Sequence, residues 1–159
     1  PREVLPIAFV TSQFINMLLS LLVVLATLIV SGFGINFKAL LYLPIIMIIE
    51  YSLSLGMALI TSAVTVYVRD LEYLLGIITM AWQFLTPIMY SVELVPAGLM
   101  PVFNLNPMTP VIIAYRDILY YKQLPKMETL LQATILGVLL IVIGWWTFSK
   151  LKRHFAEEL

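Results

Sequence analysis

Four long apolar segments constrain the fold of this chain more than any other feature of its sequence. They cover about residues 7–30, 40–68, 74–90 and 130–148. A helix needs about 20 residues, within a range of roughly 17–25, to cross the hydrocarbon core of a bilayer. We therefore predict an all-α integral membrane protein with four transmembrane helices in a single domain.

The composition agrees with lipid as the main solvent of this chain. Apolar residues make up 62% and charged residues 11% of the sequence, whereas a soluble domain has about 45–50% and about 25%. Nine basic and nine acidic residues cancel, so no basic field exists to attract nucleic acid. Cysteine is absent and the one histidine is His154, which excludes disulfides and thiolate metal sites. We expect no metal and no cofactor bound by this chain itself.

The orientation is predicted from the end of the last span. An aromatic belt and a basic cluster close it, formed by Trp145, Trp146, Lys150, Lys152 and Arg153. A span that enters the cytoplasm has this pattern. Because four spans place both ends on one side, we expect both ends and the link at residues 68–72 in the cytoplasm. The long connection over residues 91–128 then lies outside.

That connection is too apolar for an ordinary aqueous loop and is divided by five prolines: Pro96, Pro101, Pro107, Pro110 and Pro125. Thr109 before Pro110 is typical of an N-cap followed by proline at the first helical position. We predict a short helix over residues 110–121, which rises about 18 Å and cannot cross a bilayer. A second short helix is expected over residues 93–100. Together they predict an external re-entrant pair over about residues 93–121, or an interfacial pair lying flat on the membrane.

Glu50 lies about eleven positions into the second predicted span. A carboxylate at such a depth costs roughly 2.5–3.5 kcal/mol on insertion scales. Helical spacing places it on one face with Ser54, Ala58, Thr61 and Thr65. The face either lines a translocation path or fixes helix packing, helped by small pairs such as Ser52 with Gly56 and Ala58 with Ser62.

The third predicted span carries aromatic residues. Trp82, Phe84 and Tyr90 are candidates for the aromatic lining of a translocation path. The alternative is an ordinary interfacial aromatic belt.

Three blocks of sequence together resemble one family. They are residues 1–6, residues 68–72 followed by 82–91, and residues 106–110 followed by 115–117. In this order and spacing, the chain resembles the membrane subunit of type-2 ABC exporters, in the branch that moves teichoic acids, O-antigens and capsules. The resemblance covers nearly the whole chain.

The resemblance implies a permease of six membrane helices, of which this chain supplies about the third to the sixth. We therefore expect it to be part of a longer protein, which also fits the absence of an initial methionine and of a signal peptide pattern. The family implies a homodimer, two separate ATP-binding subunits and a lipid-linked polysaccharide as substrate. It also implies a bacterial plasma membrane. The chain has no G-x-x-x-x-G-K-[ST] loop, so we expect ATP to act through the partner and this chain not to be an enzyme.

The same resemblance gives roles to two further groups of residues. The external re-entrant segment would contain Asn106, Pro107, Pro110, Tyr115, Arg116 and Asp117. Arg116 and Asp117 are interpreted as a neighbouring ion pair, or Arg116 as a ligand for an anionic glycan. Contacts with the ATP-binding subunit are candidates at Arg2, Glu3, Arg69 and Asp70. Arg69 and Asp70 alternatively form a local pair or cap the third span.

Three alternatives remain open from the residues. The chain can belong to another type-2 ABC exporter, for a lipid or a drug. It can be part of a proton-coupled secondary transporter that uses Glu50, although no broken span or inverted repeat supports this. It can also be a membrane scaffold that only binds partners through its small-residue faces.

Overall fold

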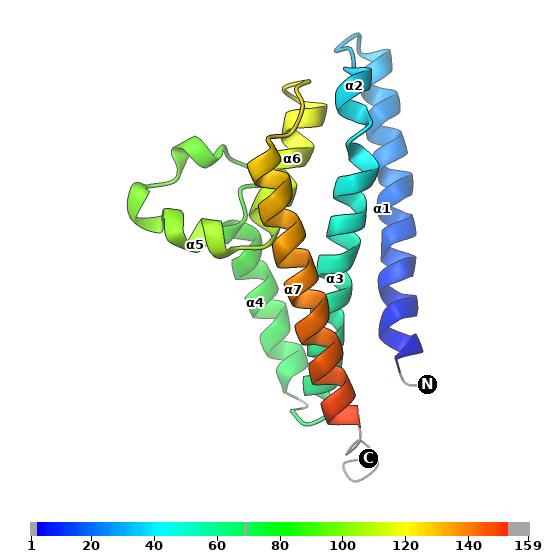
Figure 1. Cartoon of the computed structure of the whole chain (residues 1–159), viewed down its shortest axis with the longest axis vertical. Coiled ribbons are helices and arrows are strands. Elements are labelled where there is room, and N and C mark those ends of the chain that lie inside the picture. Colours follow the sequence, from blue (N-terminus) through cyan, green and yellow to red (C-terminus); the bar gives the residue numbers. More distant parts are fainter. Residues whose placement is uncertain (1–2, 69, 153–159) are drawn as a thin grey trace.

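The computed structural model describes residues 3–68 and 70–152, and within these ranges the chain forms helices and no strands (Figure 1). Arg2, Arg69, Arg153 and His154 lie outside the described residues. The long helices are α1 (Val4–Val30), α3 (Leu43–Thr65), α4 (Leu71–Leu85) and α7 (Met127–Leu151). The short elements are α2 (Phe37–Leu40), the 3-10 turns η1 (Val92–Leu94) and η2 (Ala97–Leu99), α5 (Met100–Leu105) and α6 (Met108–Leu119).

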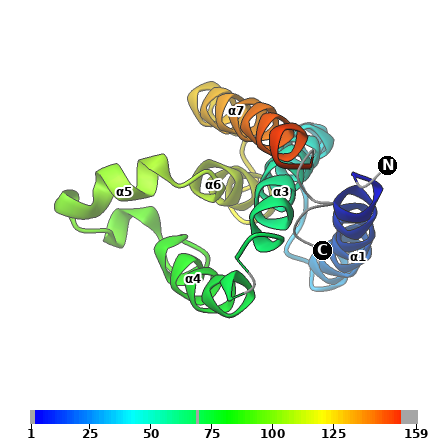
Figure 2. The same ribbon diagram turned by 90° about the horizontal axis from the view of Figure 1, so that it is seen from below.

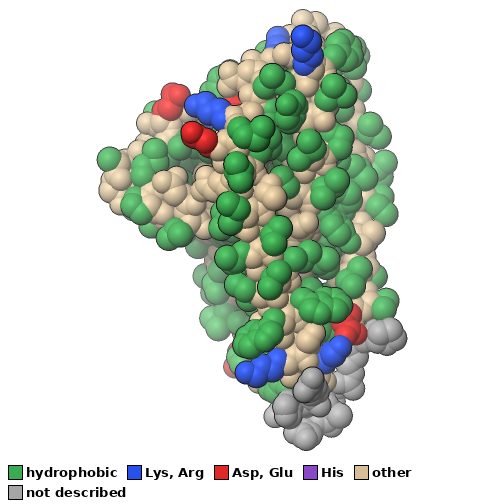
Figure 3. Space-filling model, in the orientation of Figure 1, with side chains coloured by type: hydrophobic (Ala, Val, Ile, Leu, Met, Phe, Trp, Pro, Cys, Tyr) green, Lys and Arg blue, Asp and Glu red, His purple; other side chains and the backbone are tan. Residues whose placement is uncertain are grey.

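Helix α3 is the centre of the bundle. It packs against α1 on one side and against α6 and α7 on the others, and the view from below shows these helices around it (Figure 2). The main core cluster contains α3 residues such as Ile46 and Leu53, together with Val111 and Ala114 of α6 and Ala133 of α7. The side of the bundle seen in Figure 3 is covered by apolar side chains, and the charged ones gather near its ends. This surface suits a body surrounded by lipid.

Three described helices are long and apolar enough to span a membrane: Val4–Val30, Phe37–Thr65 and Met127–Leu151. They correspond to the first, second and fourth predicted spans. The all-helical membrane class predicted from the sequence is confirmed. Both ends of the described chain lie at the same end of the bundle, as an even number of crossings requires (Figure 1).

The third predicted span is shorter than expected. Helix α4 has 15 residues, which rise about 22 Å, and it ends at Leu85 instead of near Tyr90. Thr86 is extended (φ −105°, ψ 131°), because the ring of the following Pro87 disfavours helical backbone at the preceding residue. The segment up to Tyr90 therefore turns away from the α4 axis.

The connection contains a broken pair of short helices, as predicted, but with different bounds. The expected helix at residues 93–100 is replaced by η1 and η2, and the first helical segment continues from η2 into α5. The helical runs Ala97–Leu105 and Met108–Leu119 meet at an angle of 96°. The break falls at Asn106 and Pro107, and α6 begins and ends two residues earlier than predicted. This bend is the geometry of a broken span or a re-entrant loop.

Helices α3 and α7 approach so closely that glycine is required at their crossing. A Cβ added to Gly56 would lie 2.5 Å from the carbonyl carbon of Leu140 and 2.8 Å from the nitrogen of Ile141. A Cβ added to Gly144 would lie 2.5 Å from the carbonyl oxygen of Gly56. Small residues let membrane helices pack backbone against backbone. Gly56 was expected in a small pair on α3, whereas its contact with Gly144 was not predicted.

Candidate functional site

Glu50 of α3 contacts α6, the second helix of the broken pair formed by α5 and α6. The Tyr115 hydroxyl of α6 donates a hydrogen bond of 2.5 Å to Oε2 of Glu50, and both side chains are partly buried. A membrane carboxylate is expensive unless it finds such a partner. The contact joins a residue predicted to line the path with one from the predicted re-entrant segment, a pairing that sequence spacing alone did not indicate.

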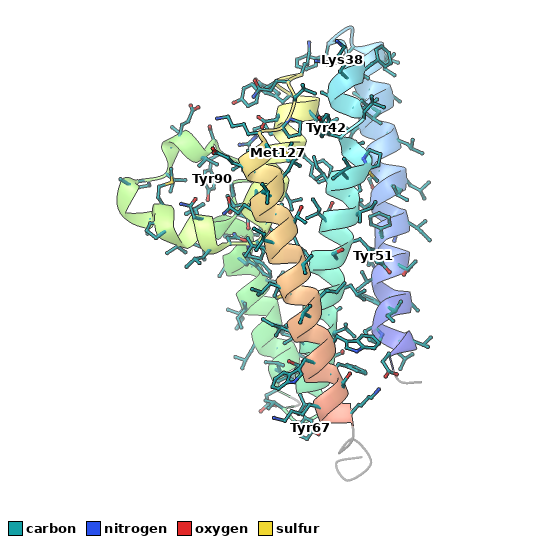
Figure 4. The ribbon with its side chains drawn as sticks, in the orientation of Figure 1. Lys38, Tyr42, Tyr51, Tyr67, Tyr90 and Met127 are labelled. Atoms are coloured by element: carbon teal, nitrogen blue, oxygen red, sulfur yellow. The ribbon has the colours of Figure 1, made fainter. Side chains whose placement is uncertain are left out.

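Glu50 also lines a groove of about 300 Å³ between α1 and α3. The polar residues of this groove are Gln13, Glu50, Tyr51 and Ser54, and aromatic and aliphatic side chains such as Phe14 surround them. Tyr51 points toward α1 (Figure 4), where its hydroxyl lies 2.9 Å from Oγ1 of Thr11. Glu50 and Ser54, both predicted from the sequence, therefore share one concave surface with Gln13, which was missed.

The other residues predicted on this face of α3 add no polar group to the groove. Ala58 lines it, but the hydroxyl of Thr61 donates to the carbonyl of Met57 and that of Thr65 to the carbonyl of Thr61. These hydroxyls are satisfied within their own helix. The polar residues of the groove are therefore Gln13, Glu50, Tyr51 and Ser54.

Trp82 takes part in a buried hydrogen-bond network around Asn106. The Trp82 Nε1–H donates to Oδ1 of Asn106 (2.8 Å), and the same oxygen accepts from the backbone N–H of Met108 (3.0 Å). The Asn106 amide donates to the carbonyl of Leu85 (3.1 Å) and to Oγ1 of Thr86 (2.9 Å). Asn106 is 8% exposed, and it joins the end of α4 to the start of α6. Trp82 also borders a small cavity with Ser54 and Pro107.

Phe84 and Tyr90 lie together, away from Glu50. The Tyr90 hydroxyl donates to the backbone carbonyl of Phe84 (2.6 Å), and its ring packs edge-on against Phe103 at 6.1 Å. The Phe84 side chain is 70% exposed. Neither residue lines the Glu50 groove, so the five candidates for the path do not form one surface within this chain.

Arg116 and Asp117 do not point toward each other as the predicted neighbouring ion pair would. The Arg116 guanidinium donates to the carbonyls of Pro87 (2.8 Å), Ile88 (3.1 Å) and Tyr90 (3.1 Å). Asp117 instead accepts a hydrogen bond from Nε2 of Gln123 (2.9 Å). Successive helical residues project about 100° apart, which separates their partners. Arg116 thereby holds the non-helical turn after α4 against α6.

The N-cap predicted at Thr109, for the short helix over residues 110–121, is also corrected. Helix α6 starts at Met108, and the Asn106 side chain accepts from the Met108 N–H, which places the capping oxygen three residues before Thr109. Pro110 is buried inside the first turn, where its missing N–H costs no intrahelical bond. Oγ1 of Thr109 is buried and has no hydrogen-bond partner within residues 3–68 and 70–152.

Replacing Thr109 with valine is therefore expected to leave the protein as stable or to stabilise it by about 1 kcal/mol. A buried hydroxyl without a partner is unfavourable by about 1–3 kcal/mol, and valine has nearly the same shape. The measurement is the unfolding midpoint in detergent, with Thr86→Val as the matched control. Because Thr86 donates to the carbonyl of Trp82 (2.8 Å) and accepts from Asn106, the control variant should lose stability. A loss of stability in Thr109→Val would show that its hydroxyl is satisfied.

Two of the four candidates for contact with an ATP-binding subunit, Glu3 and Asp70, are described by the structure. Glu3 forms a salt bridge with Lys152, and this hydrogen bond lowers the pKa of the Glu3 carboxyl below its ordinary value. The contact joins the start of α1 to the end of α7. Asp70 is exposed at the N-cap position of α4, where its side chain makes no cap hydrogen bond. Arg2 and Arg69 lie outside the described residues.

Residues 2–120 match the family described as ABC-2 type transporter. The chain belongs to this family. It is a multi-pass membrane protein of a family of transporters. Within the described residues, no group of three or more His, Cys, Asp or Glu side chains is placed to hold a metal ion.

Individual relatives within the ABC-2 transporter family come from the branch predicted from the sequence. The chain is 30% identical over 159 residues to an O-antigen export system permease protein of Klebsiella pneumoniae and 27% identical over 161 residues to one of Myxococcus xanthus. Each alignment covers 100% of this chain, but 61% and 62% of these relatives. The resemblance to type-2 ABC permeases of polysaccharide export is confirmed.

Proposed function

We propose that this chain forms part of the transmembrane path of an ATP-driven exporter of lipid-linked polysaccharide of the O-antigen type. The observation that carries the proposal is the match of the whole chain to permeases named for O-antigen export. The partners would be a second copy of the permease and two ATP-binding subunits that hold the ATP. The protein would lie in a bacterial plasma membrane, with both ends of this chain cytoplasmic and the bent pair of short helices outside.

The groove with Glu50 supports a polar path through this part of the protein. A polysaccharide moving through a membrane needs hydrogen-bonding groups to replace water, and the groove offers Gln13, Glu50 and Ser54 at a depth where such groups are costly. Its aromatic residues, Phe9, Phe14 and Tyr51, can stack on sugar C–H faces. Membership of an ABC family favours ATP over a proton gradient as the energy source.

The direct test is export by the full-length permease, reconstituted in proteoliposomes with its ATP-binding partner subunit. Lipid-linked O-polysaccharide should cross the bilayer when ATP is supplied and stay when a non-hydrolysable analogue replaces ATP. Movement of a phospholipid or drug in place of the glycan would favour another branch of the family. Movement driven by a proton gradient without ATP would contradict the proposal.

Glu50→Gln should reduce this export by about tenfold without preventing assembly. The amide keeps an acceptor for the Tyr115 hydroxyl but removes the charge, and a hydrogen bond to a charged group contributes about 1.5–3 kcal/mol. The measurement is the initial rate of ATP-dependent export, together with size-exclusion chromatography of the complex. Ser52→Ala is the control on the same helix, because the Ser52 hydroxyl bonds to the carbonyl of Ile48. Export by Glu50→Gln at the rate of the native protein would remove Glu50 from the path.

A further inference from the structure

A polar cavity lies where the C-terminal half of α6 meets the start of α7, at the end of the bundle opposite the chain termini. Its volume is about 580 Å³, within the range of roughly 300–1,000 Å³ of small-molecule sites. We call it the α6–α7 cavity. Acidic and basic side chains gather on this part of the surface (Figure 3), and those that matter here are Glu93, Asp117, Tyr121, Gln123, Lys126 and Glu128. It is separate from the Glu50 groove, with which it shares no residue.

Asp117 lines this cavity, and one oxygen of its carboxylate is unsatisfied. The side chain is 6% exposed, Oδ1 accepts from Nε2 of Gln123, and Oδ2 is buried with no partner among residues 3–68 and 70–152. A buried polar atom without a hydrogen bond costs about 1–3 kcal/mol, and more when charged. Such an atom in a native protein needs an explanation, such as a bound group that donates to it.

The side chains around Asp117 favour a ligand rich in hydroxyl groups. Glu93 and Glu128 add acceptors, Lys126 adds a donor and Tyr121 adds a half-exposed aromatic ring. The carboxylates are not grouped as metal ligands in the described part of the chain. A phosphate or acidic sugar is disfavoured, because three carboxylates line the cavity and the Arg116 guanidinium beside them already donates to three carbonyls. A neutral sugar satisfies carboxylates with its hydroxyls and stacks on a tyrosine.

We propose that the α6–α7 cavity binds neutral sugar units of the exported glycan, with Oδ2 of Asp117 accepting a hydrogen bond from a sugar hydroxyl. This inference rests on the proposed function and places a binding site on the predicted exit side. Gln123 acts as a positioning residue, because it orients the Asp117 carboxylate through Oδ1. The cavity offers polar groups to the exported glycan after it has left the membrane path.

The test measures glycan binding to the full permease complex in nanodiscs. The probe is the water-soluble O-polysaccharide, freed from its lipid by mild acid, from the cells that carry the protein. Saturation-transfer NMR titration should give saturable binding to the native complex. Asp117→Asn should weaken it about tenfold, because the amide can still accept from Gln123 but presents a donor in place of Oδ2. Thr129→Trp, which fills the cavity, should abolish it. Glu72→Gln, an exposed carboxylate on α4, is the control and should bind like the native complex.

Thermal unfolding separates binding from a structural role of Asp117. If the asparagine variant is as stable as the native complex, or more stable, and binds the glycan less well, the carboxylate serves a ligand. Native-like binding by Asp117→Asn would overturn the proposal. If Thr129→Trp fails to fold, the binding measured for Asp117→Asn is sufficient to test the proposal. A native complex that exports the glycan with ATP but does not bind the free glycan would contradict the proposed binding site and not the proposed function. A complex that neither exports nor binds would contradict both.

Discussion

Gly56→Ala is expected to destabilise the protein by roughly 3 kcal/mol or more, the upper part of the range for overpacked cores. The added methyl group would lie 2.5–2.6 Å from the carbonyl carbon and oxygen of Leu140. These are backbone atoms of α7, so no side-chain rotation can relieve the clash. The two helices must separate along their crossing, which also removes the packing of Leu53 and Leu59 in α3. Gly144→Ala should act in the same direction, since its methyl group would meet the backbone of Gly56.

The measurement is unfolding in mixed micelles by SDS titration, followed by circular dichroism. Gly76→Ala is the matched control, because a Cβ at this position in α4 meets nothing within 4 Å. This variant should be as stable as the native protein or slightly more stable, since alanine favours a helix over glycine by about 1 kcal/mol. If Gly56→Ala and Gly76→Ala unfold at the same SDS fraction, the close approach of α3 and α7 is wrong.

Asn106→Ala is expected to destabilise the broken helix pair by about 3 kcal/mol. The substitution removes four hydrogen bonds and leaves the indole N–H of Trp82, the amide N–H of Met108 and the carbonyl of Leu85 without their partner. Each buried group left unpaired costs about 1–3 kcal/mol, and Asn106 is buried, so little water can reach the groups that lose their partner. The bend between α5 and α6 should become mobile, because the side chain that caps α6 is the one that holds α4.

This effect can be measured at Trp82 in a background where Trp145 and Trp146 are phenylalanine. The fluorescence emission of Trp82 should change, and proteolysis in the 92–107 connection should become faster. Asn104→Ala is the control, since Asn104 is an exposed asparagine two residues away. The network would be ruled out as the anchor of the bend if both variants gave the same emission and the same cleavage rate.

The candidate site was only partly predictable from sequence. Glu50 and Ser54 were placed on one helix face by their spacing, because helical periodicity is local, and the structure puts both in one groove. The partner of Glu50 was not predictable, since Tyr115 is 65 positions away and only the folding of α6 against α3 brings its hydroxyl within reach. The polar residues of α1 were missed for the same reason.

The prolines predicted broken helices but not the residues at which these helices begin and end. Backbone constraints at Pro107 and Pro110 are covalent and local, so a break in this segment could be expected, whereas the end of α4 before Pro87 was not predicted. Which residue caps α6 was decided by tertiary contacts, since Asn106 is bound on its other atoms by Trp82, Leu85 and Thr86. Thr109 has the capping chemistry but faces the interior.

The sequence by itself determined the solvent, the class and the family of this protein. The length and apolar character of the segments require helices in lipid, because unpaired backbone groups are too costly there, and the ordered blocks identified an ABC-2 permease. The tertiary structure decided which polar groups meet, among them Glu50 with Tyr115 and Asn106 with Trp82, and which glycines touch. These outcomes depend on how the helices cross, and the crossing is set by shape complementarity between residues far apart in the chain.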